Sequence, residues 1–387
     1  MKNAILLLGI FLSAVLAASP CPMQKKLVLP EKIYASAGIE CNIYFRQIFM
    51  TVNPENYAFF VKCKKGRCEE KRWTYTPSKA DSGSYDIDVE VHNDEGLVAK
   101  GKTQLIIVPA DAGKGKSVSI LIMGSSTIHM RHAIPRHLHA LFKKPGNPRL
   151  AMIGENGPHW PDKTPGEIRH EGYGGWSYAR FTTRGSSNSD RPAIAYKRRN
   201  PFWNPKTKSV DFKAYLEKNN QGKAPDYLLI ALGGNDVFGC TDANIEERLK
   251  NIREQMLCLF AAIRKAAPET VIMLLQSDNT SSSQDAFGIN YGAAYFRWQV
   301  KKNFAKFREL VNEVVRTSND PNLVKVEATY AFDCENNVPV RKEGVNRYNR
   351  TPVYRQANAL HPTDAGYNQL ADVIYVWMKN HLNTRKK

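Results

Sequence analysis

The residues best suited to chemistry in this sequence lie in short motifs where predicted strands end. Residues 119–127 place four apolar residues before Gly124-Ser125-Ser126, the pattern of a strand buried on both faces that stops at a serine pair. Open α/β sheets hold their ligands at the carboxyl ends of the strands, so Ser126 would present its hydroxyl where a substrate binds. We therefore take Ser126 as a candidate nucleophile, with helix capping as its alternative role.

Three further motifs occupy comparable positions. Residues 170–176 form a glycine-rich loop whose backbone a ligand can approach closely. Residues 233–236, Gly-Gly-Asn-Asp, directly follow another buried apolar run, and His361 lies just before the last predicted helix. Turn formation is the alternative role for the glycines and the asparagine, and an exposed loop position is the alternative for the histidine.

The elements that would position these motifs alternate between strand and helix. Buried strands are predicted at 119–124, 150–154, 227–232, 270–275 and 323–327, and helices at 136–143, 242–267, 296–317 and 364–382. This alternation predicts an α/β fold, a doubly wound parallel sheet with helices on both faces. Its carboxyl edge would bring the motifs together.

The 387-residue chain is long enough for two domains, and its first part has a different pattern. Short alternating runs separated by turn residues predict a small all-β sandwich over residues 27–108. Within it, Asp81-Ser-Gly-Ser-Tyr85 resembles the corner of immunoglobulin-like domains in which a tyrosine pins a loop to a strand. The polar stretch 109–116 predicts the linker, which leaves 117–387 as the α/β domain. We favour a spacer or packing role for the β domain over sugar binding.

The first 18 residues predict an export signal. Lys2 provides a basic start, an apolar run follows to Ala18, and small residues near Ala17 and Ser19 suit cleavage. The apolar run is too short to span a membrane, and no other stretch approaches the length of a membrane span. We therefore expect a soluble protein with no membrane span, either secreted or periplasmic/extracellular.

Seven cysteines in an exported chain permit disulfides. Cys63 and Cys68 are the predicted pair, because Lys-Gly between two apolar-rich runs suggests a hairpin turn. Cys240 with Cys258 is a weaker pairing, and the odd count leaves at least one thiol free or shared. A metal site is the alternative, but no Cys-x-x-Cys spacing or matching His cluster accompanies the cysteines.

The formal net charge of +18 should attract anionic partners through long-range steering. Lys and Arg are scattered and no recognised nucleic-acid module is present, so we expect no nucleic-acid partner. For an exported protein an anionic polysaccharide or a cell envelope is at least as plausible a partner, and solubility alone is the simplest explanation. The oligomeric state cannot be predicted from the sequence.

Over residues 117–387 the chain resembles the SGNH (GDSL-type) hydrolase superfamily. Its blocks occur in the family's order: Gly124-Ser125-Ser126, Gly174-Gly175, the Gly-Gly-Asn-Asp of residues 233–236, and His361. The Gly-x-Asn-Asp after a buried strand is the most specific of these. Other segments resemble a subgroup of exported and phage-associated members often described as carbohydrate esterases: residues 171–176, residues 200–203 and His361-Pro362.

The resemblance implies a serine acyl hydrolase. A serine hydroxyl becomes an effective nucleophile when an imidazole takes its proton, which assigns Ser126 as nucleophile and His361 as base. The oxyanion of the tetrahedral intermediate would be bound by the backbone N–H groups of Ser126 and Gly175 and by the side-chain amide of Asn235. Asp236 is expected to hold the loop around Asn235. No metal or organic cofactor is implied.

Two positions depart from the family pattern. Ser125 replaces the aspartate of Gly-Asp-Ser, which affects the order of the loop more than the reaction. Asn358 stands three residues before His361, where the family has its acid. An asparagine oxygen can accept from Nδ1–H of the imidazole and hold the useful tautomer, but it supplies no charge to stabilise an imidazolium.

Two aromatic-rich segments, residues 200–205 and 287–298, suggest a substrate rim, with core packing as the alternative. Together with the glycine-rich loop they supply the predicted substrate contacts, Trp176, Trp203, Asn290 and Trp298.

The sequence therefore predicts a secreted serine esterase that removes small acyl groups, most readily acetyl, from carbohydrate. One alternative is a catalytically impaired protein of the same fold that binds carbohydrate or envelope. A lipase or thioesterase is the other.

Overall fold

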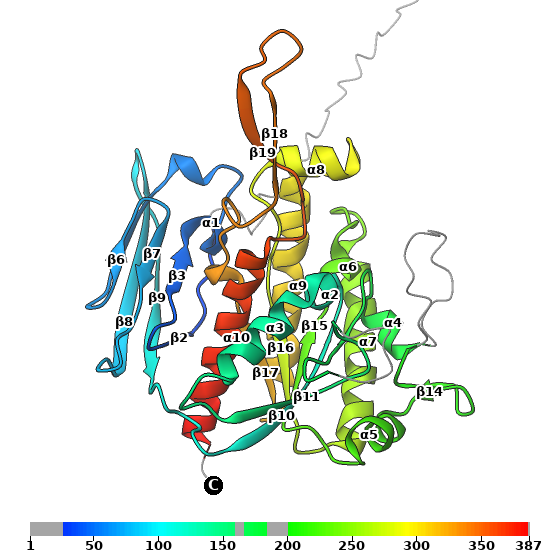
Figure 1. The fold of residues 1–387 in the computed structure, drawn as a ribbon. Helices are drawn as coiled ribbons and strands as arrows, with labels where there is room; N and C mark the ends of the chain where they lie inside the picture. Colours follow the sequence, from blue (N-terminus) through cyan, green and yellow to red (C-terminus); the bar gives the residue numbers. More distant parts are fainter. Residues whose placement is uncertain (1–25, 159–165, 184–199, 386–387) are drawn as a thin grey trace, which may run out of the picture.

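The centre of the computed structural model, which describes residues 26–158, 166–183 and 200–385, is a parallel sheet (Figure 1). The predicted export signal and Cys21 lie outside the described residues. The order is β11-β10-β15-β16-β17, with β12 beside the end of β10. These strands are Arg149–Ile153, Ser117–Gly124, Tyr227–Ala231, Val271–Gln276, Leu323–Glu327 and, for β12, Glu171–Gly172. All their pairings are parallel, so the predicted α/β class is confirmed.

Alternating side chains of β10 point into two separate cores, as the period of two in a strand requires. Ile120 and Ile122 belong to one core, and Leu121 and Met123 to the other. The first core is covered by α3 (Ala133–Phe142) and α10 (Asp364–Thr384). The second is covered by α5 (Phe212–Asn220), α7 (Ile245–Ala266) and α9 (Arg297–Thr317). The helices therefore lie on both faces of the sheet.

Four of these five helices were predicted to within a few residues, whereas α5 was not. Its sequence does contain a start signal, because Asp211 accepts a hydrogen bond from the N–H of Ala214 at 3.0 Å as an N-cap. Phe212, Tyr215 and Leu216 then form a short buried stripe at helical spacing. Nine residues are too few for that periodicity to stand out from a loop.

The N-terminal region is rich in β structure. One sheet has the order β2-β9-β8-β5 and the other β3-β7-β6, while β1 and β4 form a pair. Tyr85 donates its hydroxyl to the carbonyl of Ser82 at 2.9 Å, which fits the loop-pinning role expected of it. Classification as immunoglobulin-like stays a prediction. The strands are Lys26–Leu27, Lys32–Ser36, Cys41–Tyr44, Phe49–Met50, Ala58–Lys62, Arg67–Cys68, Arg72–Tyr75, Gly83–Asn93 and Gly96–Val108, from β1 to β9.

This β region packs directly on the α/β region. Ile43 and Phe45 belong to the same buried cluster as Phe332 and Val373, so one hydrophobic core crosses the junction. Polar contacts reinforce it; for example, Gln47 donates to the carbonyl of Asp278 at 3.1 Å. The β region is thus a packing partner of α10 and of loops of the α/β region, and the predicted linker at 109–116 stays a prediction.

The predicted Cys63–Cys68 disulfide is wrong, since both are free thiols in the structure. The turn between them is not a hairpin: β5 pairs with β8 in one sheet, whereas β6 pairs with β7 in the other. The Cys63 sulfur accepts from the N–H of Lys65, and the Cys68 thiol contacts the carbonyl of Phe59. Cys240 and Cys258 are also free, the first buried and the second exposed.

Candidate functional site

The nucleophile segment is held by backbone contacts at the carboxyl edge of the sheet. Strand β10 ends at Gly124, and α2 (Ser126–His129) follows at once. Ser125 is the N-cap of this short helix, and its N–H donates to the carbonyl of Ala231 at the end of β15, at 3.2 Å. The capping role therefore belongs to Ser125, which leaves the hydroxyl of Ser126 available for other contacts.

His361 lies against this hydroxyl. Its Nε2 is 2.9 Å from Oγ of Ser126, although 235 residues separate them in the chain. Burial lowers the pKa of the His361 imidazole, and the nearby Arg131 cation lowers it further. The ring is therefore neutral at physiological pH and able to accept a proton, which is the state a general base requires.

Among the described residues Asn358 makes no hydrogen bond to the ring of His361, contrary to the role expected for it. Its Oδ1 accepts instead from the backbone N–H groups of Leu360 at 3.1 Å and of His361 at 2.9 Å. Asparagine forms such local turns readily because its side-chain oxygen reaches the backbone two or three residues ahead. Within the described residues no side chain or carbonyl bonds Nδ1 of His361. Asn358 thus holds the main chain that carries His361.

Two further asparagines hold the loop that carries His361. Asn290, from α8 (Gln284–Tyr291), donates to the carbonyl of Ala357 at 3.1 Å and accepts from the N–H of Ala359 at 2.8 Å. Asn279, which follows β16, is buried and donates to the carbonyl of Leu360. Asn290 was predicted to bind substrate, and its amide is used within the loop instead. Asn279 was missed, although a polar residue just after a buried strand is a usable signal.

Arg131 connects the two halves of the site and was not predicted from the sequence. It lies shortly after Ser126 in the chain, has a left-handed φ of 50°, and donates to the carbonyl of Pro362 at 2.7 Å. The same guanidinium is paired with Asp364 and lies 5.7 Å from the ring centre of Tyr367. Arg131 therefore fastens the segment after the nucleophile to the loop of the base.

The predicted oxyanion donors lie on loops that hydrogen bonds tie together. Asn235 donates one amide hydrogen to the carbonyl of Trp176 at 2.9 Å, which orients the second hydrogen, and no described residue accepts that second hydrogen. Tyr173 donates to the carbonyl of Gly124 at 2.9 Å, which links the glycine-rich loop to the end of β10. Gly175 has a φ of 77°, a left-handed conformation that disfavours other residues. As the first residue of α2, Ser126 has an N–H without an acceptor in its own helix.

Asp236 stabilises the loop that carries Asn235. Its carboxylate accepts from the N–H of Tyr178 at 3.1 Å, which ties the loop of Asn235 to the start of α4 (Tyr178–Thr182). Burial raises the pKa of Asp236 to about 6. Gly233 is required nearby, because its φ is 104° and a Cβ would come within 2.1 Å of the Phe307 ring.

A buried histidine stabilises the glycine-rich loop. Nδ1 of His170 accepts from the N–H of Gly172 at 2.9 Å, so its proton must lie on Nε2. That nitrogen is 2.8 Å from Nδ1 of His132, one of four histidines after the nucleophile. His132 therefore has a packing role beside the loop, and His137 pairs with Asp372 at 2.9 Å.

The predicted aromatic rim is not formed by the tryptophans assigned to it. Trp176 is 5% exposed and packs between Tyr173 and Phe181, with ring centres 4.5 and 4.8 Å away. Trp298 is 6% exposed and packs with Met50 of the β region. Trp203 is half-buried on β13 (Trp203–Asn204), and among the described residues it forms no hydrogen bond with Ser126 or His361. Core packing, the alternative interpretation, explains the first two.

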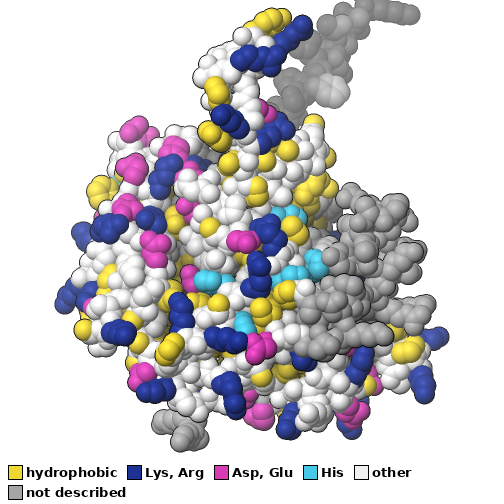
Figure 2. Space-filling view, in the orientation of Figure 1, with side chains coloured by type: hydrophobic (Ala, Val, Ile, Leu, Met, Phe, Trp, Pro, Cys, Tyr) yellow, Lys and Arg dark blue, Asp and Glu magenta, His cyan; other side chains and the backbone are white. Residues whose placement is uncertain are grey.

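The outer face shows basic and acidic side chains interspersed over the body of the molecule rather than one basic patch (Figure 2). None of the described helices has the length and apolar character needed to cross a membrane.

The chain is similar to proteins of known family and structure. The family described as GDSL-like Lipase/Acylhydrolase matches residues 120–374. No curated protein matches the chain. Among solved structures, the chain is similar to a family 3 carbohydrate esterase from Talaromyces cellulolyticus, with 15% identity, a TM-score of 0.38, and coverage of 70% of this chain and 100% of that one.

It is also similar to a family two carbohydrate esterase from Clostridium thermocellum in complex with cellohexaose. There the identity is 14%, the TM-score is 0.34, and the coverage is 90% of this chain and 94% of that one. At such identities and TM-scores neither similarity carries information about substrate.

Proposed function

Because the chain belongs to the GDSL-like lipase/acylhydrolase family and is a serine esterase by that membership, we propose that it removes small acyl groups from carbohydrate outside the cell. Acetyl is the acyl group we favour. The observation that carries the proposed mechanism is the 2.9 Å contact between Oγ of Ser126 and Nε2 of His361. Secretion rests on the N-terminal sequence alone.

Acylation begins when Oγ of Ser126 attacks the ester carbonyl and its proton passes to Nε2 of His361. The carbonyl oxygen becomes an oxyanion, which the N–H groups of Ser126 and Gly175 and the free amide hydrogen of Asn235 stabilise. The C–O bond to the sugar then breaks, and the departing sugar oxygen takes the proton from His361. The acyl group remains on Ser126.

Deacylation repeats the same steps with water. His361 takes a proton from water as the hydroxide attacks the acyl-enzyme carbonyl, and the proton returns to Oγ as the Ser126 ester breaks. The His361 imidazolium that forms during acylation, and again during deacylation, has no carboxylate partner on Nδ1 among the described residues. Its stabilisation must therefore come from solvent and from the orientation set by the asparagine-held loop.

A serine-directed fluorophosphonate tests this function on the purified chain. We expect labelling of the wild type that Ser126→Ala abolishes and His361→Ala strongly slows. Hydrolysis of p-nitrophenyl acetate by the same three proteins should follow the labelling. Wild-type protein that is folded yet neither labelled nor active would contradict the proposal.

No carboxylate of the described residues bonds His361, which favours one second candidate, a carbohydrate-binding protein with impaired catalysis. Binding of an acetylated polysaccharide that survives both Ser126→Ala and His361→Ala, without ester hydrolysis by the wild type, would identify that function.

A further inference from the structure

A long β-hairpin projects from the body of the molecule just before the loop of His361 (Figure 1). It consists of β18 (Val340–Gly344) and β19 (Pro352–Gln356), paired antiparallel, and we call residues 340–356 the basic hairpin. Its second strand ends five residues before His361. The base of the basic hairpin is therefore continuous in the chain with the loop that carries His361.

The composition of the basic hairpin is unusual for an exposed arm. It has five basic residues and a single acidic one, Glu343, together with exposed apolar and aromatic side chains that are visible on the arm in Figure 2. Tyr348 is 90% exposed and Tyr354 is 70% exposed. Rings this exposed bury little surface within this chain, so burial does not explain their presence.

The two faces of the basic hairpin differ in charge because side chains alternate along each strand. On one face Glu343 pairs with Arg341 at 2.6 Å and with Arg355 at 2.8 Å. On the other face Lys342 lies opposite Tyr354 in the strand register, with no carboxylate partner among the described residues. The second face therefore presents a free cation beside an exposed ring.

The tip repeats this combination. Arg347 lies over the ring of Tyr348, 5.7 Å from its centre, and Arg350 follows. Within the described chain neither arginine has a carboxylate partner. The tip is also ordered, because Oδ1 of Asn346 accepts from the N–H groups of Tyr348 and Asn349, both at 2.9 Å. An ordered tip loses less conformational entropy when it binds a partner.

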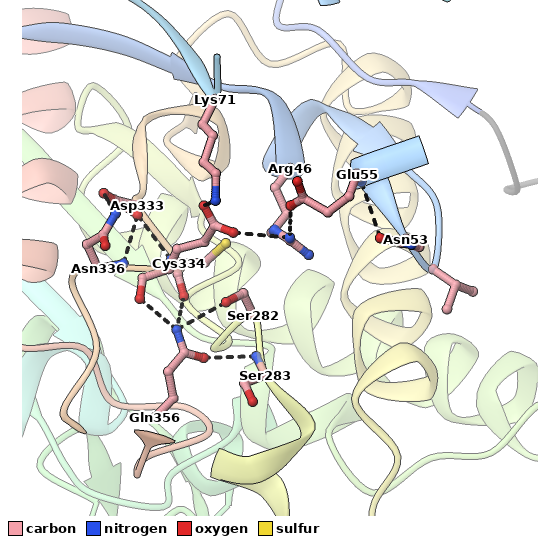
Figure 3. A network of polar contacts seen from close by, with 12 residues as sticks. Arg46, Asn53, Glu55, Lys71, Ser282, Ser283, Asp333, Cys334, Asn336 and Gln356 are labelled. Carbon is pink, nitrogen blue, oxygen red and sulfur yellow. Dashed lines mark hydrogen bonds and ion pairs between the residues drawn. The ribbon is translucent and has the colours of Figure 1, made fainter. Parts of the chain in front are cut away.

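The base of the basic hairpin is fixed to the rest of the protein (Figure 3). Gln356 is buried, its amide nitrogen lies 2.9 Å from the carbonyl oxygen of Cys334, and its oxygen accepts from the N–H of Ser283 at 2.8 Å. The neighbouring Glu335 binds Arg46 at 3.1 Å and Lys71 at 3.0 Å, both from the β region. The arm therefore stands on a polar junction of both regions rather than on a free loop.

We propose that the basic hairpin is a docking arm for an anionic polysaccharide, which it guides to Ser126. Arginine and lysine bind the carboxylate groups of such a chain, and the exposed tyrosines stack on its sugar rings. This inference rests on the proposed function in one respect, since it identifies the substrate class as acylated acidic glycan. Continuity with the loop of His361 favours a polymer that carries the reacting ester over a membrane or another protein.

The test compares two triple variants of the full chain. Arg347→Ser/Tyr348→Ser/Arg350→Ser removes two cations and one ring from the tip. Lys102→Ser/Phe60→Ser/Lys213→Ser removes the same charges and one ring from positions that are 71%, 53% and 80% exposed elsewhere. The substrates are O-acetylated polygalacturonate, neutral O-acetylated glucomannan and p-nitrophenyl acetate.

We expect the tip variant to lose about tenfold in kcat/KM on acetylated polygalacturonate, the sum of two exposed ionic contacts and one ring contact. Its activity on p-nitrophenyl acetate should stay at the wild-type level, and the loss should shrink as salt is raised. The control variant should match the wild type on every substrate. Equal activity of both variants on the anionic polymer, or equal losses on the neutral and anionic polymers, would overturn the proposal.

Binding separates this inference from the proposed function. In the Ser126→Ala background, affinity electrophoresis in polygalacturonate should show retardation that the tip substitutions remove. If the wild type fails to hydrolyse any ester but this retardation is seen, the function is wrong and the docking arm stands. If the tip substitutions instead abolish binding to phosphatidylserine vesicles, or convert a dimer to a monomer, with retardation unchanged, the arm serves another partner and the inference is wrong.

Discussion

The two halves of the proposed site are held in different ways. Ser126 stands at the end of a central strand, and backbone hydrogen bonds of the sheet edge fix its segment. His361 lies on a loop that asparagine side chains from three different positions hold, with Arg131 as a further support. The nucleophile is therefore placed by the fold itself, and the base is placed by individual side chains.

This difference indicates where substitutions should matter. Near Ser126, replacing a neighbouring side chain leaves the backbone ladder intact, so apart from the close-packed glycines mainly the reacting groups should be sensitive. Near His361, each amide satisfies loop backbone groups that no other described residue bonds, so residues that never touch substrate should affect the rate.

The largest effect is expected on the nucleophile side. Ser126→Ala should lower kcat/KM for p-nitrophenyl acetate by about 10⁴-fold or more, because the covalent route is lost. Ser125→Ala, one residue away, removes only the cap and should cost about 1 kcal/mol of unfolding free energy with most activity retained. Thermal unfolding and steady-state kinetics of both variants check this. A Ser125→Ala variant as inactive as Ser126→Ala would show that the backbone alone does not hold the segment.

A smaller effect is expected for Asn235, the proposed oxyanion donor in the Gly-Gly-Asn-Asp motif of residues 233–236. Asn235→Ala should reduce kcat by about 10²- to 10³-fold with little change in KM, because its amide acts on the oxyanion rather than on bound substrate. Asp236→Asn is the matched control. Its side-chain oxygen still accepts from the N–H of Tyr178, so its kcat should change far less. Equal losses in the two variants would assign the effect to loop structure.

A still smaller loss of kcat is expected from Asn290, which holds the loop of His361 and takes no part in the reaction itself. Asn290→Ala leaves the carbonyl of Ala357 and the N–H of Ala359 without their partner, so kcat should fall about tenfold as the imidazole is misplaced. Stability should decrease by about 1 kcal/mol. Steady-state kinetics at saturating substrate measure the fall in kcat, and denaturant unfolding measures the loss of stability. A stability loss with unchanged kcat would mean that the amide supports the fold but not the base.

The smallest effect is a shift of the pH profile. His361 must be neutral to act as base, and its lowered pKa places the acid limb of kcat/KM below the position of an ordinary histidine. Arg131→Met removes the nearby cation, and Asn358→Asp adds an anion while keeping the acceptor for the two N–H groups. Both changes favour the imidazolium and should move the acid limb to higher pH. An unmoved limb in both variants would contradict electrostatic control of His361 by its loop.

Most of the α/β framework could be predicted because its signals are local. Runs such as residues 120–123 and 271–275 are apolar throughout, and α7 and α9 carry buried apolar residues at helical spacing along most of their length. The basic hairpin was not predicted, because neither of its strands has an apolar face that would mark it. The Cys63–Cys68 pair failed because two adjacent strands joined different sheets, which sequence spacing does not reveal.

The sequence by itself determined the order of the motifs, the buried strands that precede Ser126 and Asn235, and the glycines that their turns require. Each of these depends on neighbours in the chain. Only the tertiary structure decided what holds His361, that Asn358 bonds the main chain rather than the ring, and that the tryptophans expected around the substrate lie in the core. Those outcomes depend on which side chains from distant segments meet in the folded chain, and hydrogen bonds between residues 69 or 231 positions apart leave no periodic trace in the sequence.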